Sequence, residues 1–369
     1  MQNLQKVNAP VLYTYDIPTL MPGDIILSKN SSKQSIGIQK ATASNYSHAM
    51  LYTEKTIVHA DGGGVFTTNP QRKLFLMGES AVFRPINITP QQSLMACQFA
   101  LNLSGSIYSI PEAIRAASLH GTDQRARSNA QFCSRLVAQA YSSVGLELVS
   151  NPDYCHPGQF ENNPHLHLVG NAIRPALPGE IKISETPDTV AIHQQHTFDW
   201  LKKTVKLAKK QANVEIMTIV DAINFAISHP KFNSTIASYI KKSQYLEDYM
   251  LDKIANPHRY DTATFKQKII NENSIPAQAL TFELETNINV KNNATSQLSQ
   301  FDQIRAPNLE AINIIAEMHA QRLFQVEERI KTIKEIANSY KLTSIALQCD
   351  IELNSINYTI NNCIHKYTK

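Results

Sequence analysis

The sequence contains one cysteine whose surroundings suit a nucleophile. Cys133 opens a stretch in which apolar residues recur at helical spacing, so it is expected in the first turn of a helix. The apolar face of this helix would consist of Phe132, Leu136, Val137, Ala140 and Tyr141. Ser128 or Asn129 can cap the helix, and its unpaired amides and positive dipole end then favour a thiolate over a thiol. A small cysteine packed under the helix is the alternative interpretation.

A base for this thiol is available in His48, which stands at the head of an apolar strand that leads into a hairpin. If the turn is centred on Thr53 and Glu54, His48 lies opposite His59; if it is centred one residue later, His48 lies opposite Asp61. In both registers, strand alternation keeps a polar partner on the same sheet face as His48. The sequence therefore predicts a thiol, an imidazole that takes its proton, and a third group that fixes the imidazole tautomer.

Four short segments carry these residues in a specific order. They are residues 22–27, 44–49, 57–60 and 132–137. In this order they resemble the YiiX/YaeF-like permuted papain-fold cysteine amidases. Those amidases belong to the NlpC-type peptidoglycan endopeptidase superfamily, which also contains lecithin retinol acyltransferase. The resemblance covers about residues 18–170, and the histidine precedes the cysteine, as in the circularly permuted members.

The resemblance implies a role for each residue. Cys133 resembles the nucleophile, His48 the general base and His59 the third polar residue, with Asp61 as the alternative to His59. The third position is Glu in many YiiX-like proteins and His in the retinol acyltransferase branch, which leaves the substrate branch open. Near the thiol, Tyr46 and Ser134 are expected to line the substrate and oxyanion site, with the backbone amide at the helix start as one oxyanion donor.

The implied reaction is acyl transfer through a thioacyl enzyme, which requires neither a metal nor an organic cofactor. Three functions follow as hypotheses. The first is cleavage of a peptide or isopeptide amide, with bacterial peptidoglycan as the favoured substrate. The second is lipid acyl hydrolysis or transfer of the lecithin retinol acyltransferase type. The third is a catalytically idle binding protein whose helical part recognises a protein partner.

Composition narrows these classes. The chain has 369 residues, 43% hydrophobic and 18% charged, which is typical of a folded protein of two domains. The net charge of +4 comes from 35 basic and 31 acidic residues interspersed along the chain, so no nucleic-acid partner is expected. The five cysteines form no CxxC pair, and the cluster Cys155, His156, His165 and His167 fits no common zinc-finger spacing.

The pattern along the chain predicts an α+β first domain, residues 1–187, with a circularly permuted papain-like fold of antiparallel sheet plus helices. Short strands are expected between residues 20 and 90, and helices over 35–43, 91–103 and 130–144. Residues 151–187 are rich in Pro, Asn, Gly and His, which indicates a loop segment that leaves the domain.

A mainly α-helical second domain is predicted for residues 188–369. Apolar residues between Ile312 and Tyr340 follow a four-three spacing over about four heptads, and residues 342–360 carry a second apolar stripe. The polar stretch 287–299 is interpreted as a loop. The basic cluster at residues 202–210 is interpreted as a solvated helix face, with membrane-surface contact as the less supported alternative.

The start of the chain bears on localisation. Residues 1–10 carry Gln, Asn and Lys where a secretory signal needs an apolar run, and no stretch reaches the roughly 18 apolar residues of a membrane helix. The protein is therefore expected to be cytoplasmic as synthesised. Together with the wall- and lipid-directed families that it resembles, this suggests a bacterial effector exported by a signal-independent secretion system.

Overall fold

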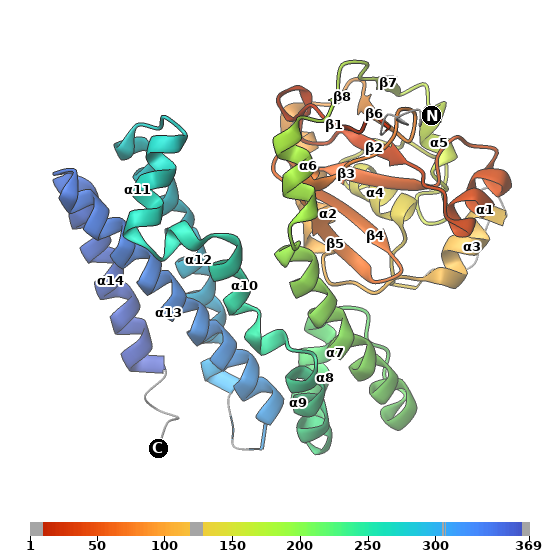
Figure 1. The fold of residues 1–369 in the computed structure, drawn as a ribbon. Helices are drawn as coiled ribbons and strands as arrows, with labels where there is room; N and C mark the ends of the chain where they lie inside the picture. The colour runs from red at the N-terminus through yellow and green to blue at the C-terminus, as the bar shows by residue number, and fades with distance from the viewer. Residues whose placement is uncertain (1–9, 119–127, 305, 307, 364–369) are drawn as a thin grey trace, which may run out of the picture. The chain divides into compact units, whose positions relative to one another are not determined.

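The computed structural model describes residues 10–118, 128–304, 306 and 308–363 (Figure 1). The chain divides into two compact units. The first extends to Phe198 and includes Met217–Ile219; the second comprises Asp199–Ile216 and the chain from Val220 onward. The division falls within helix α7, Thr189–Ala212, eleven residues beyond the boundary expected at residue 187.

The first unit is built on an antiparallel six-stranded sheet with strand order β5-β4-β3-β2-β6-β7. Its strands are β2 Ile25–Ser28, β3 His48–Tyr52, β4 Ile57–Asp61, β5 Gly64–Thr68, β6 Ser80–Pro85 and β7 Leu166–Leu168. A two-stranded sheet pairs β1 Tyr13–Tyr15 with β8 Ile173–Pro175. These sheets, with the helices around them, confirm the α+β class and the strands expected between residues 20 and 90.

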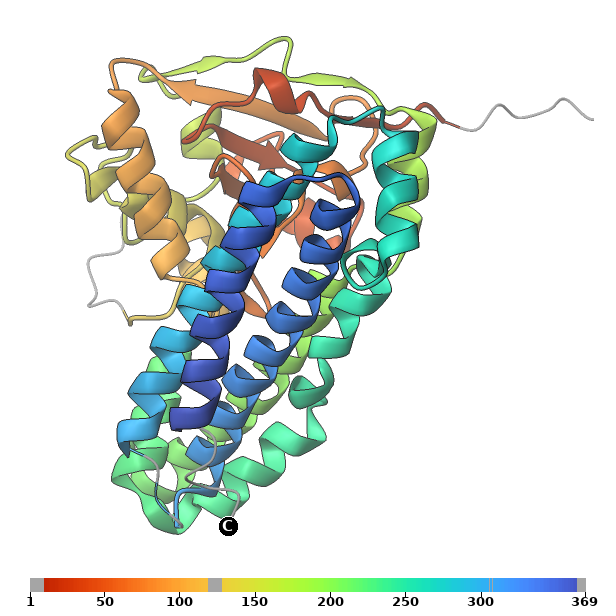
Figure 2. The ribbon, with the colours of Figure 1, turned by 90° about the vertical axis from the view of Figure 1, so that its left-hand side faces the viewer.

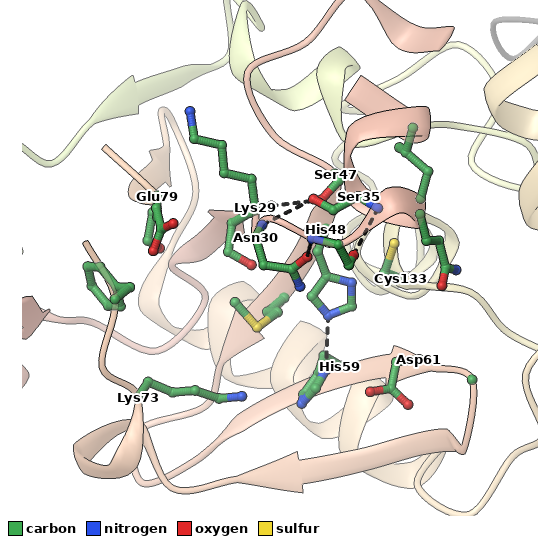
Figure 3. Close-up of a pocket in the computed structure, with 18 of the residues that line it drawn as sticks. Lys29, Asn30, Ser35, Ser47, His48, His59, Asp61, Lys73, Glu79 and Cys133 are labelled. Atoms are coloured by element: carbon green, nitrogen blue, oxygen red, sulfur yellow. Dashed lines mark hydrogen bonds between the residues drawn. The ribbon is translucent and has the colours of Figure 1, made fainter. Parts of the chain in front are cut away.

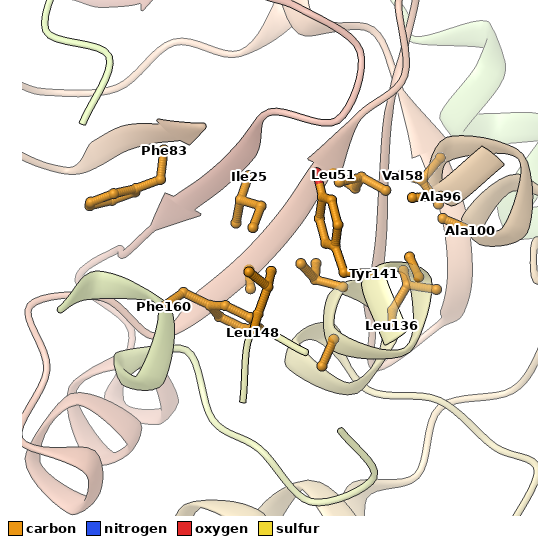
Figure 4. Close-up of a cluster of buried hydrophobic side chains, with 14 of the residues drawn as sticks. Ile25, Leu51, Val58, Phe83, Ala96, Ala100, Leu136, Tyr141, Leu148 and Phe160 are labelled. Atoms are coloured by element: carbon orange, nitrogen blue, oxygen red, sulfur yellow. The ribbon is translucent and has the colours of Figure 1, made fainter. Parts of the chain in front are cut away.

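Both faces of the central strands are buried. Successive side chains of a strand point to opposite faces, so Ile25 and Leu51 enter one apolar cluster while Ile26 and Met50 enter another. Helices cover the first cluster, as Figure 4 shows for Leu136 and Tyr141 of α4 beside Ile25 and Leu51. The sheet is thus held rigidly between two layers of side chains.

In the described residues of the first unit, six helices precede α7. They are α1 Lys33–Thr42, α2 Pro90–Asn102, α3 Ile110–Ser118, α4 Cys133–Ser142, α5 Gly158–Glu161 and α6 Pro178–Glu185, with 3₁₀ turns η1 Ile17–Thr19 and η2 Pro70–Arg72. Helices α1, α2 and α4 occupy the ranges where helices were predicted. The loop predicted for residues 151–187 is partly wrong, because β7 pairs with β6 and β8 pairs with β1.

The second unit is helical throughout its described part. After α7 come α8 Ile219–Ser228, η3 Pro230–Phe232, α9 Asn233–Lys242, η4 Tyr245–Glu247, α10 Tyr249–Ala255, η5 Pro257–Arg259, α11 Thr262–Asn271, α12 Pro276–Ile304, α13 Glu310–Ser339 and α14 Thr343–Cys363. Helices α12, α13 and α14 pack along one another (Figure 2). Helix α13 carries the predicted four-three stripe on its buried side. No helix in the described ranges combines the length and apolar character that crossing a bilayer demands.

The loop predicted for residues 287–299 is wrong, since these residues lie inside α12. Two of their polar side chains, Asn287 and Lys291, face the helical packing, while others such as Asn292 and Asn293 are exposed. Asn287 is 1% exposed, and the buried ammonium of Lys291 pairs with the carboxylate of Glu352 on α14. Polarity was therefore a misleading sign of a loop here, because a polar helix has exposed positions and its buried polar groups find partners.

Replacing Lys291 should destabilise the helical unit. In Lys291→Met the carboxylate of Glu352 stays buried without its cation, which costs about 3 kcal/mol of unfolding free energy. Urea unfolding followed by far-ultraviolet circular dichroism measures this loss. The matched control is Lys331→Met, because Lys331 pairs with Glu327 at an exposed position and its loss should change stability by less than about 0.5 kcal/mol. Equal effects of the two substitutions would contradict the role assigned to Lys291.

Candidate active site

Cys133 is the first residue of α4 and is 6% exposed. Backbone amides of Ala49, Ser134 and Cys133 itself act on its sulfur. Burial raises the pKa of the Cys133 thiol, and these amides act in the opposite direction. The thiol is therefore protonated at rest, in a position where amide dipoles stabilise negative charge as it develops on sulfur.

The expected cap at Ser128 or Asn129 is wrong. The N-cap is Phe132, which has an extended backbone and makes no side-chain cap. Ser128 instead binds the Glu112 carboxylate through its hydroxyl, at 2.6 Å, and its N–H, at 2.9 Å. Because no side chain caps α4, the amide of Ser134 in its first turn is free to face the thiol.

The hairpin register follows the second alternative. Leu51 pairs with Val58 and Tyr52 with Ile57, so continuing the ladder sets His48 opposite Asp61. Among the described residues, the side chain of His48 makes no hydrogen bond with Asp61. Instead, its Nε2 lies 3.0 Å from Nδ1 of His59, the diagonal neighbour on the same face. The backbone register and the side-chain partner are therefore separate outcomes.

Figure 3 shows the His48 ring between the thiol of Cys133 and the ring of His59. Since Nε2 of His48 is engaged by His59, Nδ1 is the nitrogen available on the thiol side. Among the described residues, the thiol and the imidazole make no hydrogen bond with each other. The three side chains lie in the order expected of a nucleophile, a base and an orienting group. Of the two contacts that this order requires, the one between His48 and His59 is made.

Both imidazoles are neutral at pH 7. Burial, together with the positive charge of Lys73, lowers the pKa of His48 to about 4. Burial also holds the pKa of His59 well below its usual range, with smaller effects from His48 and Lys73. A neutral imidazole beside a protonated thiol can accept a proton only as the sulfur attacks, so charge would separate during the reaction.

The remaining predicted residues lie in different places. Asp61 lines the same pocket as Cys133 and accepts the Gly63 N–H at 3.0 Å. The Ser134 hydroxyl donates to the Cys155 carbonyl at 2.8 Å, and both this side chain and the Ser134 backbone amide lower the pKa of the Cys133 thiol. Tyr46, which was expected to line the site, is outside the pocket wall and packs against the apolar core.

The pocket in front of the thiol has a volume of about 590 Å³. Most of the residues that line it are polar or charged, among them Lys29, Asn30, Ser32, Gln34 and Glu79. Apolar side chains such as Ile38, Met50 and Ile110 are interspersed with them. Such a wall offers hydrogen bonds to a polar ligand together with smaller apolar contacts.

Besides the polar residues of the pocket wall, the sequence analysis did not find Lys73, Tyr108 or Arg135. Lys73, after η2, and Tyr108, before α3, line the pocket. Arg135 is fully buried two residues after Cys133, where its Nη1 lies 2.9 Å from the Glu112 carboxylate and its Nε donates to the Asp153 carbonyl. Of these three residues, only Arg135 had a signal in the sequence, because it is a charged residue within an apolar helical pattern.

In the part of the chain that the structure describes, no three His, Cys, Asp or Glu side chains gather in a way that could hold a metal ion. The described segment with Cys155 and His156 is included in this statement.

Comparisons with known proteins add little to this geometry. No family model matches the chain, and no curated protein matches it. Among solved structures, the chain is similar to the metalloprotein YiiX from Escherichia coli O157:H7, with a TM-score of 0.31 and 21% sequence identity. The similarity covers 42% of this chain and 98% of that one. The activity is accordingly inferred from the site residues.

The low pKa of His48 predicts an acid-dependent loss of stability. Between pH 6.5 and about 4 the unfolded chain binds a proton at His48 and the folded chain does not, so stability falls as the pH falls through this window. The loss from this group is on the order of 3 kcal/mol. Denaturant unfolding of His48→Gln at several pH values should show a shallower acid slope. The exposed control His165→Gln should keep the wild-type slope, and an unchanged slope in His48→Gln would contradict the prediction.

Proposed function

We propose that this protein is a cysteine hydrolase that cleaves an amide, in a peptide or isopeptide bond, with a circularly permuted papain-like catalytic unit. One observation carries the proposal: the His48 imidazole is neutral, bound to His59 through Nε2, and directs Nδ1 toward the side of the Cys133 thiol. This is the arrangement that nucleophile activation by a general base requires.

The proposed reaction uses the residues in sequence. As the Cys133 sulfur forms a bond to the amide carbonyl, its proton passes to Nδ1 of His48, and amides at the start of α4 stabilise the developing negative charge. His48 then gives this proton to the departing amine as the C–N bond breaks. Water attacks the thioacyl carbon, with His48 again taking a proton, and the C–S bond breaks to restore the thiol.

His59 has a positioning role in this scheme. In the arrangement that permits catalysis, its Nδ1 accepts a hydrogen bond from Nε2–H of His48 across the 3.0 Å contact, which fixes the ring and stabilises the imidazolium that forms during attack. A neutral imidazole does this less strongly than a carboxylate. The proposed enzyme therefore depends more on the amides around the sulfur for charge stabilisation.

The lining of the pocket supports a peptide substrate over an acyl chain. A lipid tail needs a continuous apolar slot, whereas Lys29, Asn30, Gln34 and Glu79 in this wall would lose their hydration without gaining hydrogen bonds. Peptides present amides and charged ends to such groups. Cell-wall peptides are the first substrates to test, and lipid acyl transfer is the second candidate.

Loss of the thiol should abolish turnover. Cys133→Ala is expected to lower kcat for a cleaved peptide by about 10⁴-fold or more, because the covalent step has no other nucleophile. The measurement is release of the new amine from muropeptides and synthetic isopeptides. Cys97→Ala is the control, since Cys97 is buried outside the pocket and its loss should leave kcat within about twofold. Full activity in Cys133→Ala would refute the proposal.

The pocket also predicts substrate preference. Incubation with peptide amides should produce turnover that depends on Cys133, whereas incubation with phospholipid vesicles should leave the mass of the intact protein unchanged. Mass spectrometry of the whole chain reads both results, with Cys133→Ala as the blank. An acyl adduct on Cys133 after exposure to phospholipid would favour the lipid function over the peptide function.

A further inference from the structure

One nitrogen at the candidate site has no partner. Nε2 of His59 is buried without a hydrogen bond, and the His59 side chain as a whole is 4% exposed. Its other nitrogen, Nδ1, is occupied by His48. The ring packs against Phe66, with the ring centroids 4.3 Å apart, and this apolar contact gives Nε2 no hydrogen-bond partner.

The Lys73 side chain points toward that edge. Figure 3 shows its ammonium directed at the His59 ring from the side away from His48. Within the described ranges, no side chain forms an ion pair or a hydrogen bond with this ammonium. Its charge nevertheless acts on both imidazoles, as their lowered pKa values record.

Two neutral arrangements of the imidazole pair satisfy the 3.0 Å contact. In the first, His48 donates through Nε2–H, which leaves its Nδ1 bare toward the thiol and puts the His59 proton on Nε2. In the second, His59 donates through Nδ1–H, so the His48 proton sits on Nδ1 and Nε2 of His59 is bare. Only the first arrangement allows His48 to act as the base.

The charge of Lys73 distinguishes the two arrangements. An ammonium near Nε2 of His59 attracts the bare lone pair of the second arrangement and repels the N–H of the first. A neutral amine has no such preference and can accept the N–H. The protonation state of Lys73 therefore selects which nitrogen of His48 faces Cys133.

We propose that Lys73 is a positioning residue that, as an ammonium, holds the His48–His59 pair in the arrangement in which His48 cannot accept the Cys133 proton, and that loss of its charge releases the catalytic arrangement. This regulation rests on the proposed cysteine hydrolase function. The exchange conserves protons: the shared proton moves from His59 Nδ1 to His48 Nε2, His48 Nδ1 gives one to pocket water, and His59 Nε2 takes one from water.

The charges around Lys73 set the pH at which this happens. Burial lowers the pKa of the Lys73 amine, while Asp61 at the end of β4 and Asp188 just before α7 raise it. The charge of Lys73 in turn acts on the two imidazoles, from β3 and β4, and Glu79 and Lys29 line the same pocket. Below the Lys73 pKa the ammonium favours the idle arrangement, so activity should rise as the pH increases through that pKa.

The direct test reads the imidazole protons without relying on catalysis. Long-range ¹H–¹⁵N spectra of the full histidine-labelled chain, assigned with His48→Gln and His59→Gln, report which ring nitrogen carries hydrogen. At pH 7 the wild type should show His48 protonated on Nδ1, and Lys73→Met should show it on Nε2. Lys73→Arg keeps the charge and should keep the wild-type pattern.

Controls make the result specific. Lys29→Met removes another pocket lysine and should leave the His48 proton on Nδ1. Raising the pH of the wild type should move the proton to Nε2 without any substitution, which covers the case of a variant that fails to fold. Wild type with Nε2–H on His48 at pH 7, or Lys73→Met with the wild-type pattern, would overturn the proposal.

The kinetic consequence separates this inference from the function. Lys73→Met should raise kcat/KM for a cleaved peptide roughly tenfold at pH 7 and remove the alkaline rise of the wild type. If no peptide is cleaved by any variant, the proposed function fails while the proton positions still stand. If peptides are cleaved and Lys73→Met has wild-type proton positions and pH profile, the role of Lys73 fails alone.

Discussion

The packing of helix α4 against strand β3 is the constraint on which the site depends. Each residue of α4 from Cys133 to Tyr141 is buried, and its apolar side chains belong to the cluster under the sheet. This packing brings the sulfur to the Ala49 amide, one residue after His48. The proposed nucleophile and base are thus positioned by buried elements of the first unit, which leaves them little freedom to move apart.

The same burial determines the electrostatics. Taking Cys133, His48 and His59 out of water favours their neutral forms, so these three groups rest uncharged. Backbone amides of β3 and α4 partly offset the rise that burial causes in the pKa of the Cys133 thiol. Away from the thiol, buried Arg135 and Glu112 tie α4 to α3 and to the chain that enters it, where a side-chain cap would otherwise have done so.

The helical unit also buries polar groups, and these groups are paired with one another. Lys291 is buried with Glu352 on the neighbouring helix, and Asn287 lies within reach of Arg329 at 3.4 Å. Such pairs contribute less to stability than apolar contacts of equal size, but they penalise any other register of the helices. The packing of α12 against its neighbours is therefore specified by partners as well as by the apolar stripe.

The sequence by itself determined the α+β class, the central strands, most helices of the first unit and the long amphipathic helix α13, because these follow from periodicity within one segment. It also singled out Cys133 and His48, and it reduced the partner of His48 to His59 or Asp61. Only the tertiary structure decided that His59 is bound, that Lys73 faces it, and that residues 287–299 continue a helix. These outcomes depend on which group, distant in the sequence, contacts a buried polar atom. The spacing of residues within one segment does not determine such a contact.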